Sequence, residues 1–306
     1  MRIIKNFLAW IIVLGALTFC AIYREQILSY LLVKIIYPHQ SIIEEKNKYA
    51  HNIDYSIFKN TNDFTPENKQ ELLNTFYTII NNGWENFSFT CDLSYKNCIS
   101  DIQEFLDNDY PLSYLNDFVH PYNNFDQIEV VTNNYGRVDI TVDKLYSNED
   151  ITAINNELEK IYQQIITSNM TDIEKIKAFH DYIINNTKYL YEPNENENTS
   201  FPLKTNTAYG AIFNHVASCS GYTDVMSLFL HKIGIQNYKI SSLEHVWNLV
   251  NINNEWKHLD LTWDDPVTNT GEDILTHNFF LITTDELKNK NVAEHDYDSN
   301  IFKEAQ

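Results

Sequence analysis

The chain has 306 residues, of which 43% are hydrophobic and 14% aromatic, enough to bury a substantial core and too many for a disordered protein. Glycine and proline are scarce, at seven residues each, which excludes collagen-like and linker-dominated chains. The formal net charge is −20 at pH 7, and because such a surface repels phosphate backbones we expect no nucleic-acid partner. The length allows one large domain or two modest ones.

The N-terminal segment, residues 1–24, is basic and then apolar, unlike the acidic remainder. An uncharged and mostly apolar run, residues 7–23, lies between Lys5 and Arg24, at the short end of the roughly 17–25 residues that span a bilayer. The basic residues before the run favour a cytoplasmic N-terminus. A cleaved signal peptide is the alternative, but no clean small-x-small site follows, which favours an uncleaved anchor. We therefore expect a single-pass protein of the cell membrane with an extracellular body.

Residues 27–37 continue apolar but contain Lys34, and we interpret them as an amphipathic or packing helix and not as a second membrane span. Residues 38–64 are polar, and the range 25–64 is predicted to be a stalk. The first helix of the body is predicted over residues 65–82, because its apolar residues recur at helical spacing. Thr65 is expected to be its N-cap, and Pro66 to take its first position.

The four cysteines fit an exported chain. Cys20 lies in the apolar run, and Cys91 and Cys98 lie seven residues apart in a polar stretch. This spacing allows a disulfide that closes a small loop outside the cytosol. Cys219 is left without a partner, and a lone thiol in an exported protein is either packed in a core or reactive.

The elements between this stretch and Cys219 follow from turn and capping signals. NNYG between two alternating runs predicts a hairpin, and Thr171 followed by Glu174 is a capping box that begins a helix. In chain order we expect strands over 127–132 and 137–142, helices over 149–168 and from Thr171 onward, and a polar loop over 192–206.

A helix is predicted to start near Cys219 and to end before Gly234, and three strands follow it. The strands are expected over residues 238–243, 245–252 and 255–262. The last two are separated by Asn253-Asn254, a two-residue turn, because Asn tolerates the positive φ that such a turn needs.

This short turn predicts the register of the two strands around it. If Ile252 pairs with Glu255, then His245 lies opposite Thr262 and diagonally across from Asp260, on the same face of the sheet. An imidazole and a carboxylate would then be within hydrogen-bonding reach. A slip of one residue would put them on opposite faces.

Cys219 completes a set of three residue types that suit nucleophilic catalysis. In the first turn of a helix, its sulfur is close to free N–H groups and to the positive end of the helix dipole, which favour a thiolate. A nearby imidazolium would lower the thiol pKa further, and a carboxylate on the other ring nitrogen would orient that imidazole. Cys219 alone would more often be a packed thiol, but the combination favours a reactive one.

The residues around these three positions resemble bacterial transglutaminase-like domains of the papain-like superfamily. The resemblance covers residues 171–287 strongly and 65–170 more loosely, and residues 279–287 resemble the family's closing strand. Ser218 and Thr223 depart from the family's expected residues. The matching motifs are Ala208-Tyr209-Gly210, Cys219-x-Gly221-Tyr222, His245-x-Trp247-Asn248-x-Val250, Trp256, Asp260-x-Thr262-Trp263-Asp264 and Pro266.

This resemblance implies an α+β fold with a papain-like core, in which the helix that bears Cys219 packs on an antiparallel sheet. An N-terminal transmembrane helix is expected in addition. We therefore divide the chain into a membrane anchor or signal segment (1–24), a stalk (25–64), an upstream helical and hairpin region (65–170) and a transglutaminase-like catalytic core (171–306).

The resemblance also implies a reaction. Cys219 would be the nucleophile, His245 the general base and then acid, and Asp260 the orienting carboxylate. The enzyme would transfer or hydrolyse an acyl group at a carboxamide or peptide bond through a Cys219 thioester. We expect a protein or peptide substrate, with cell-wall peptides as one candidate. A peptidase or amidase that uses water, and a non-catalytic binding or scaffold module, are the alternatives.

No cofactor or metal is expected. Two adjacent carboxylates, Asp264 and Asp265, precede Pro266 and are interpreted as part of a turn and not as a calcium site. His258 is expected to be a neighbour of the site, and the remaining histidines, His295 among them, show no metal-ligand spacing.

Overall fold

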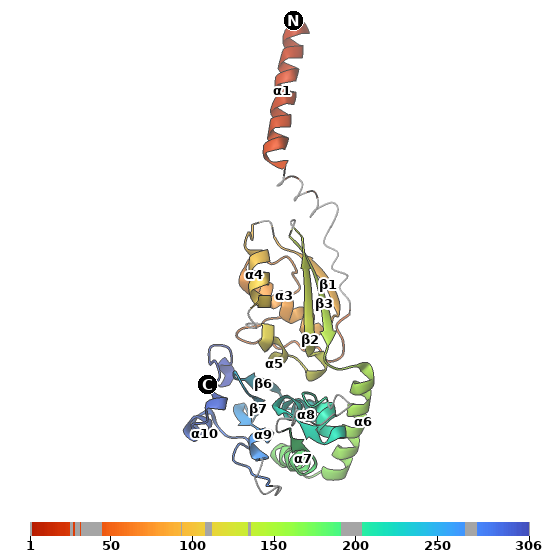
Figure 1. The fold of residues 1–306 in the computed structure, drawn as a ribbon, viewed down its shortest axis with the longest axis vertical. Coiled ribbons are helices and arrows are strands. Elements are labelled where there is room, and N and C mark those ends of the chain that lie inside the picture. The colour runs from red at the N-terminus through yellow and green to blue at the C-terminus, as the bar shows by residue number, and fades with distance from the viewer. Residues whose placement is uncertain are drawn as a thin grey trace, which may run out of the picture.

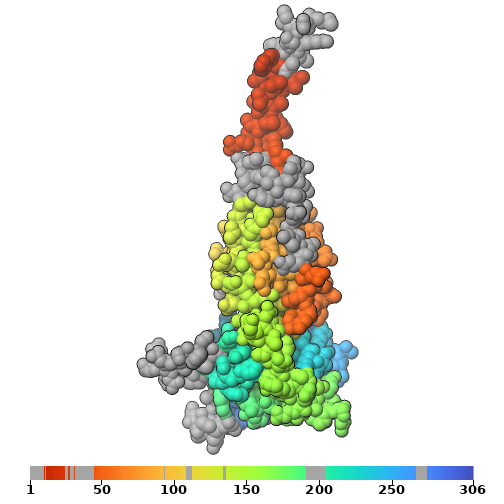
Figure 2. Space-filling model, turned by 90° about the vertical axis from the view of Figure 1, so that its right-hand side faces the viewer, coloured from red at the N-terminus to blue at the C-terminus, as the bar shows by residue number. Residues whose placement is uncertain are grey.

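The structure, a computed structural model, describes most of the chain in several stretches. These are residues 2–24, 27, 31, 45–92, 94–107, 112–133, 136–190, 204–266 and 274–305. The body has two lobes (Figure 1). We call residues 45–144 the N-terminal lobe and residues 145–305 the C-terminal lobe. The side view in Figure 2 shows the two lobes in continuous contact on that face.

The N-terminal lobe is a three-stranded antiparallel sheet packed against helices. Its strands are β1 (Asn86–Thr90), β2 (Phe125–Thr132) and β3 (Arg137–Lys144), in the order β1-β3-β2. The predicted hairpin is confirmed as β2 and β3, while β1 was not predicted. The main helices are α3 (Lys69–Asn82), α4 (Cys98–Asp107) and the short α5 (Leu115–Phe118). Cys91 and Cys98 form a disulfide that joins the end of β1 to the start of α4.

The predicted start of the first helix is wrong by one turn. α3 begins at Lys69, and its N-cap is Asn68, whose side chain accepts a hydrogen bond from the backbone N–H of Glu71. Glu71 in turn accepts from the backbone N–H of Glu67. Asn68 is therefore the stronger cap, and the Thr65-Pro66 pair lies outside the helix.

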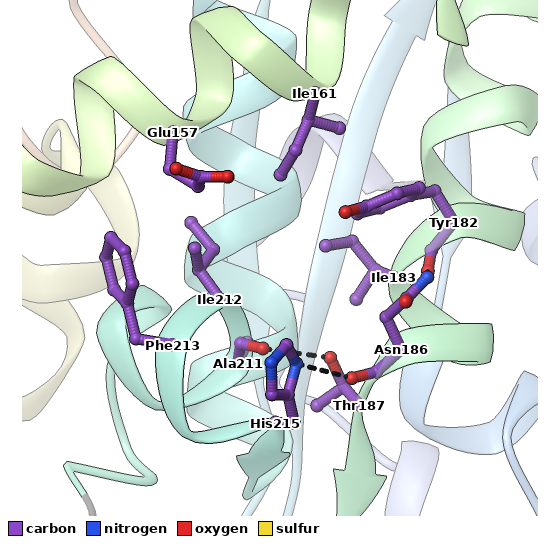
Figure 3. Close-up of a pocket in the computed structure, with 10 residues that line it drawn as sticks. All are labelled: Glu157, Ile161, Tyr182, Ile183, Asn186, Thr187, Ala211, Ile212, Phe213 and His215. Carbon is purple, nitrogen blue, oxygen red and sulfur yellow. Dashed lines mark hydrogen bonds between the residues drawn. The ribbon is translucent and has the colours of Figure 1, made fainter. Parts of the chain in front are cut away.

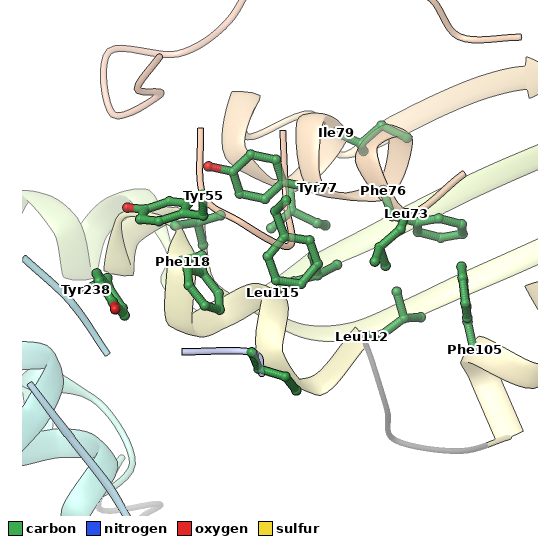
Figure 4. Packing of buried hydrophobic residues seen from close by; sticks show 14 of the residues in the cluster. Tyr55, Leu73, Phe76, Tyr77, Ile79, Phe105, Leu112, Leu115, Phe118 and Tyr238 are labelled. Carbon is green, nitrogen blue, oxygen red and sulfur yellow. The ribbon is translucent and has the colours of Figure 1, made fainter. Parts of the chain in front are cut away.

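The second half of the predicted stalk is part of the core. Tyr55 and Phe58 are buried, and both pack edge-on against Phe118 of α5, with ring centroids 4.8 and 5.1 Å away. Phe118 also stacks on Tyr238 of the C-terminal lobe at 5.2 Å, as Figure 4 shows. Residues 45–64 are thus not a free spacer, and one aromatic cluster joins the two lobes.

The C-terminal lobe places helices against a second antiparallel sheet. Its helices are α6 (Asn148–Ile165), α7 (Asp172–Asn186), α8 (Cys219–Lys232), α9 (Leu261–Asp264) and α10 (Thr284–Lys290). Its sheet has the order β6 (Asn237–Ser241), β7 (Val246–Ile252) and β8 (Glu255–Leu259). α8 packs on β6 and β7, and its Phe229 stacks on Phe179 of α7 with ring centroids 4.0 Å apart. The α+β core with a cysteine-bearing helix on an antiparallel sheet is therefore confirmed.

The predicted register is confirmed as far as the ladder extends. Asn253 and Asn254 both have positive φ, 54° and 65°, and the pairing runs from Ile252↔Glu255 to Asn248↔Leu259. The predicted extension of the last strand to residue 262 is wrong. β8 ends at Leu259 because the Asp260 side chain accepts from two backbone N–H groups and caps α9.

Two expectations about the ends of the chain also change. Residues 279–287 do not form a closing strand: they contribute one β-bridge, between Ile282 and His258, and then begin α10 with a Thr283–Glu286 capping box. At the other end, Arg2–Ile22 forms the helix α1. In the stretches that the structure describes, we find no helix with both the length and the apolar character needed to cross a membrane.

A π-helical turn guides the chain toward Cys219. The turn η4 (Gly210–Asn214) ends at His215, which has a positive φ of 57° and whose Nδ1 donates to the Asn186 carbonyl at 2.8 Å. Thr187 donates to the Ala211 carbonyl nearby, and these groups line a small pocket between α6, α7 and η4 (Figure 3). β5 (Val216–Ala217) then pairs with β4 (Lys188–Tyr189), which fixes the segment just before Cys219.

Candidate active site

The structure brings Cys219, His245 and Asp260 together from three elements. Cys219 is the first residue of α8, His245 immediately precedes β7, and Asp260 immediately follows β8. His245 and Asp260 are buried, while Cys219 is partly exposed and has no disulfide partner. The site thus has a thiol that solvent can reach and a covered pair behind it.

Close backbone packing fixes the start of α8. Ser218 is the N-cap in an extended conformation, and its backbone N–H donates to the Thr205 carbonyl at 2.9 Å. A Cβ added at Gly221 would lie 2.4 Å from the same carbonyl oxygen. Only glycine fits this approach, which explains the small residue two positions after Cys219.

Thr223, one of the departures from the family pattern, ties the cysteine helix to the histidine strand. Its hydroxyl lies 2.9 Å from the Val246 carbonyl and 2.8 Å from the Cys219 carbonyl. Asn248 of β7 donates from its side-chain amide to the Thr223 carbonyl at 3.1 Å. These bonds hold the first turn of α8 against the start of β7, next to His245.

The imidazole of His245 is held by Asp260. His245 Nε2 donates to Asp260 Oδ2 at 2.6 Å, which leaves Nδ1 as the ring nitrogen that can interact with the Cys219 sulfur. The other carboxylate oxygen, Oδ1, accepts from the backbone N–H groups of Thr262 and Trp263 at 2.9 and 3.2 Å. Asp260 is thus fixed by the short helix that it caps.

A fourth residue, His295, lies at the site and was missed by sequence reasoning. Its Nε2 donates to the same oxygen, Asp260 Oδ2, at 2.8 Å. It belongs to the 3-10 turn Ala293–His295, 35 residues after Asp260. No spacing signal connects the two residues along the chain, so only the fold could reveal their contact.

The electrostatics favour an ionised thiol. Burial raises the pKa of the Cys219 thiol, but the hydrogen bond and charge of His245, together with the backbone N–H groups of Val246 and Ser220, lower it below its ordinary value. Burial lowers the pKa of His245, but the charge and hydrogen bond of Asp260 raise it to about 10. Both shifts favour a thiolate beside an imidazolium over a neutral thiol beside a neutral imidazole.

The carboxylate stays ionised. Burial raises the pKa of Asp260, but the charge and hydrogen bond of His245, with the hydrogen bond of His295, hold it well below its usual range. His258 is a neighbour, as expected: it accepts from Trp247 Nε1 at 2.9 Å, and burial lowers its pKa to about 3.

The adjacent carboxylates Asp264 and Asp265 are occupied by protein groups. Asp264 accepts from the backbone N–H of Phe279 at 3.0 Å and bonds to His180 Nε2 at 3.2 Å. Asp265 accepts from the Tyr222 hydroxyl. Asp264 is the last residue of α9 and Asp265 is its C-cap, so the pair ends a short helix.

Two groups of possible metal ligands occur in the described stretches: His180 with Asp181 and His277, and His245 with Asp260 and His295. In both groups each imidazole nitrogen lies 2.6–2.9 Å from the central carboxylate oxygen. These distances are of hydrogen-bond length.

An open cleft lies between the two lobes and is lined by the residues that directly follow Cys219 and His245. These two residues, Ser220 and Val246, line it from the C-terminal lobe. Asp117 of α5 and Asp126 of β2 line it from the N-terminal lobe.

Comparison with known proteins places this arrangement in a family. The sequence model of the transglutaminase-like superfamily matches residues 159–261, a range that contains Cys219, His245 and Asp260. No curated protein matches the chain.

Two solved structures are similar. One, described as a TGase, is 14% identical with a TM-score of 0.33 over 45% of this chain and 44% of its own. The other, a candidate cysteine protease from Cytophaga hutchinsonii, is 15% identical with a TM-score of 0.27 over 50% of this chain and 66% of its own. The chain therefore spans less than half of the first structure and about two thirds of the second. On the strength of the family match, residues 159–261 belong to a transglutaminase-like superfamily domain.

Proposed function

We propose that this chain is a thiol enzyme of the transglutaminase-like type, which attacks a carboxamide or peptide bond through a thioester on Cys219. The proposal rests on the series of contacts from Cys219 through His245 to Asp260. The Cys219 sulfur at the start of α8 faces His245, and Asp260 holds the far nitrogen of that imidazole at 2.6 Å.

The chemistry follows from this charge arrangement. The Cys219 thiolate attacks the carbonyl carbon, and the backbone N–H at the first position of α8 is suited to the oxyanion. His245 then gives its proton to the departing nitrogen, so that ammonia or an amine leaves and a thioester remains. An amine or water attacks the thioester and gives a proton to His245, which releases the acyl product and restores the thiolate.

Transfer and hydrolysis share this acyl-enzyme, so the outcome depends on which acceptor reaches the cleft. The cleft is open and lined by polar groups of both lobes, which suits a protein or peptide chain better than a small apolar molecule. Cell-wall peptides remain one candidate class. A scaffold module would need neither a lowered thiol pKa nor a carboxylate with four hydrogen-bond donors, which favours the enzyme.

The location proposed for this reaction is outside the cytosol. The disulfide between Cys91 and Cys98 is of a kind that persists in oxidising compartments. The basic and then apolar N-terminal segment has the order of an export signal, whether it is retained at the membrane or removed.

Trapping the acyl-enzyme tests the proposal. Iodoacetamide should label Cys219 in the full chain and not in Cys219→Ala, while Cys20→Ala, which removes the other free cysteine, should label normally. Mass spectrometry with glutamine-containing and cell-wall peptides, with and without added amine, should then detect a peptide adduct on Cys219. Transfer gives an amine-linked product, and hydrolysis gives a free acid. A folded protein whose Cys219 neither labels nor forms an adduct would contradict the proposal.

A further inference from the structure

Asp260 receives hydrogen bonds from two imidazoles on one oxygen. His245 Nε2 lies 2.6 Å from Oδ2, and His295 Nε2 lies 2.8 Å from the same atom. The two rings are nearly perpendicular, with centroids 5.3 Å apart, so both can point an N–H at this oxygen without a clash. His295 lies outside residues 159–261, the range of the family match.

The side chain of His295 is enclosed by three aromatic rings. It stacks on Phe279 with ring centroids 4.9 Å apart, meets Trp247 edge-on at 4.9 Å and contacts Trp263 at 5.3 Å. Its side chain is 3% exposed. A group so enclosed cannot leave Asp260 without disturbing three large rings, which gives the hydrogen bond a fixed direction.

The backbone on either side of the two histidines is joined through Ser242. The Ser242 hydroxyl donates to the Glu294 carbonyl at 2.6 Å, and it accepts from the backbone N–H of His245 at 3.1 Å. The residue before His295 and the residue that contacts Cys219 are thus tied to one side chain. His295 and His245 therefore keep a common spacing around Asp260.

The surroundings define which proton His295 carries. Its Nδ1 is buried and has no hydrogen-bond partner among the described residues. A proton on Nδ1 would be a buried hydrogen-bond donor without an acceptor, which costs folding free energy. The neutral ring with its proton on Nε2 therefore fits this environment. His295 is therefore an N–H donor to Asp260.

We propose that His295 is a positioning residue of the thiol site, which holds Asp260 Oδ2 toward His245 and takes up part of the carboxylate's negative charge. This inference rests on the function proposed above. Without the second N–H, the whole charge of Asp260 would act on His245 and bind its proton more tightly. The proton that must pass to the leaving nitrogen would then be held back.

Other charged or titratable groups near the ring are few and lie to its sides. His258 lies beyond Trp247 and interacts electrostatically with His295, and Lys290 lies over the ring of Phe279 at 4.7 Å. Neither His258 nor Lys290 forms a hydrogen bond to Asp260, whose side chain accepts from His245, His295 and two backbone N–H groups. A change at His295 therefore reaches the thiol through Asp260 and His245.

The test compares His295→Leu with His295→Gln in the full chain, because the glutamine amide can place an N–H where the imidazole Nε2 lies and leucine cannot. The readout is the pH dependence of Cys219 alkylation by iodoacetamide, followed on the Cys219 peptide. Because His245 would hold its proton more tightly, His295→Leu should move the upper end of the profile, where His245 loses its proton, to higher pH, and His295→Gln should restore it. His277→Leu is the matched control, because His277 is a histidine that bonds to Asp181 and not to Asp260.

A second readout keeps the test valid if the leucine variant does not fold. Nitrogen-15 histidine spectra of the wild-type protein should show the neutral His295 ring as the Nε2–H tautomer. Identical profiles for wild type and both His295 variants, or a protonated Nδ1 in the spectra, would overturn the inference. If Cys219 of the wild type is unreactive, the proposed function itself fails, which is a distinguishable result.

Discussion

Replacing His245 by glutamine tests the charge state of Cys219. The substitution removes the imidazolium charge and its hydrogen bond, which lower the thiol pKa. It leaves the burial that raises this pKa and the backbone N–H groups of Val246 and Ser220 that lower it. The pKa of Cys219 should therefore rise. Since a thiol with a pKa of about 8.5 is only about 0.3% ionised at pH 6, the variant should hold very little thiolate there.

The wild-type protein should behave differently over the same range. Its thiolate–imidazolium pair persists from the lowered thiol pKa up to the His245 pKa of about 10, so alkylation should reach its plateau at a lower pH than it does in the variant. At pH 6 we expect His245→Gln to react at least about tenfold more slowly, with the difference closing as the pH rises.

The assay is pseudo-first-order labelling by iodoacetamide, quantified on the Cys219 peptide from pH 4 to about pH 10. His277→Gln serves as the control, since it makes the same substitution at a histidine that bonds Asp181 instead of the thiol site. A wild-type profile that follows an ordinary thiol, or a His245→Gln rate equal to wild type at pH 6, would refute the ion-pair reasoning.

Three further substitutions test other parts of the argument. Asp260→Asn removes the charge that raises the His245 pKa; alkylation at pH 6 should slow as in His245→Gln, and urea unfolding should record a loss of about 2–4 kcal/mol. Replacing Cys91 and Cys98 by serine opens a short loop, which should cost about 2 kcal/mol of unfolding free energy without changing Cys219 labelling. Gly221→Ala would normally raise the unfolding free energy by about 1 kcal/mol in a helix, but its Cβ would lie 2.4 Å from the Thr205 carbonyl oxygen. We therefore expect a net loss of about 2 kcal/mol or more of unfolding free energy and slower Cys219 labelling. A more stable variant would argue against that close approach.

The parts of the site that sequence reasoning predicted are those that local rules determine. The two asparagines of the turn set the strand pairing, and this register carried the prediction that His245 and Asp260 share a face. The first turn of α8 was readable because small residues flank Cys219 and apolar residues recur after it. The end of β8 was not predicted. The Asp260 side chain accepts from the backbone N–H groups of Thr262 and Trp263, which would otherwise be available to continue the strand ladder.

What sequence reasoning missed depends on contacts between distant segments. His295 meets Asp260 only because a turn after α10 folds back onto the sheet. Tyr55 and Phe58 lie in a stretch that is polar on average, and their burial depends on Phe118, some sixty residues away in the chain. Average polarity predicts a stalk there, whereas two well-placed aromatic residues are enough to anchor the stretch.

The family match ends at residue 261, but the geometry of the site does not. β6, which leads into the loop before His245, is held by the N-terminal lobe: Tyr238 stacks on Phe118 at 5.2 Å, and the Ser241 hydroxyl donates to Asp117. The same loop is held from the other side, where Ser242 bonds the turn that carries His295. The His245 imidazole must contact the Cys219 sulfur on α8 and an Asp260 oxygen after β8 at the same time. A shift of the N-terminal lobe, or of the turn that Ser242 contacts, would therefore lengthen one of those two contacts. The N-terminal lobe and the segment after residue 261 therefore both help to position His245 relative to the thiol.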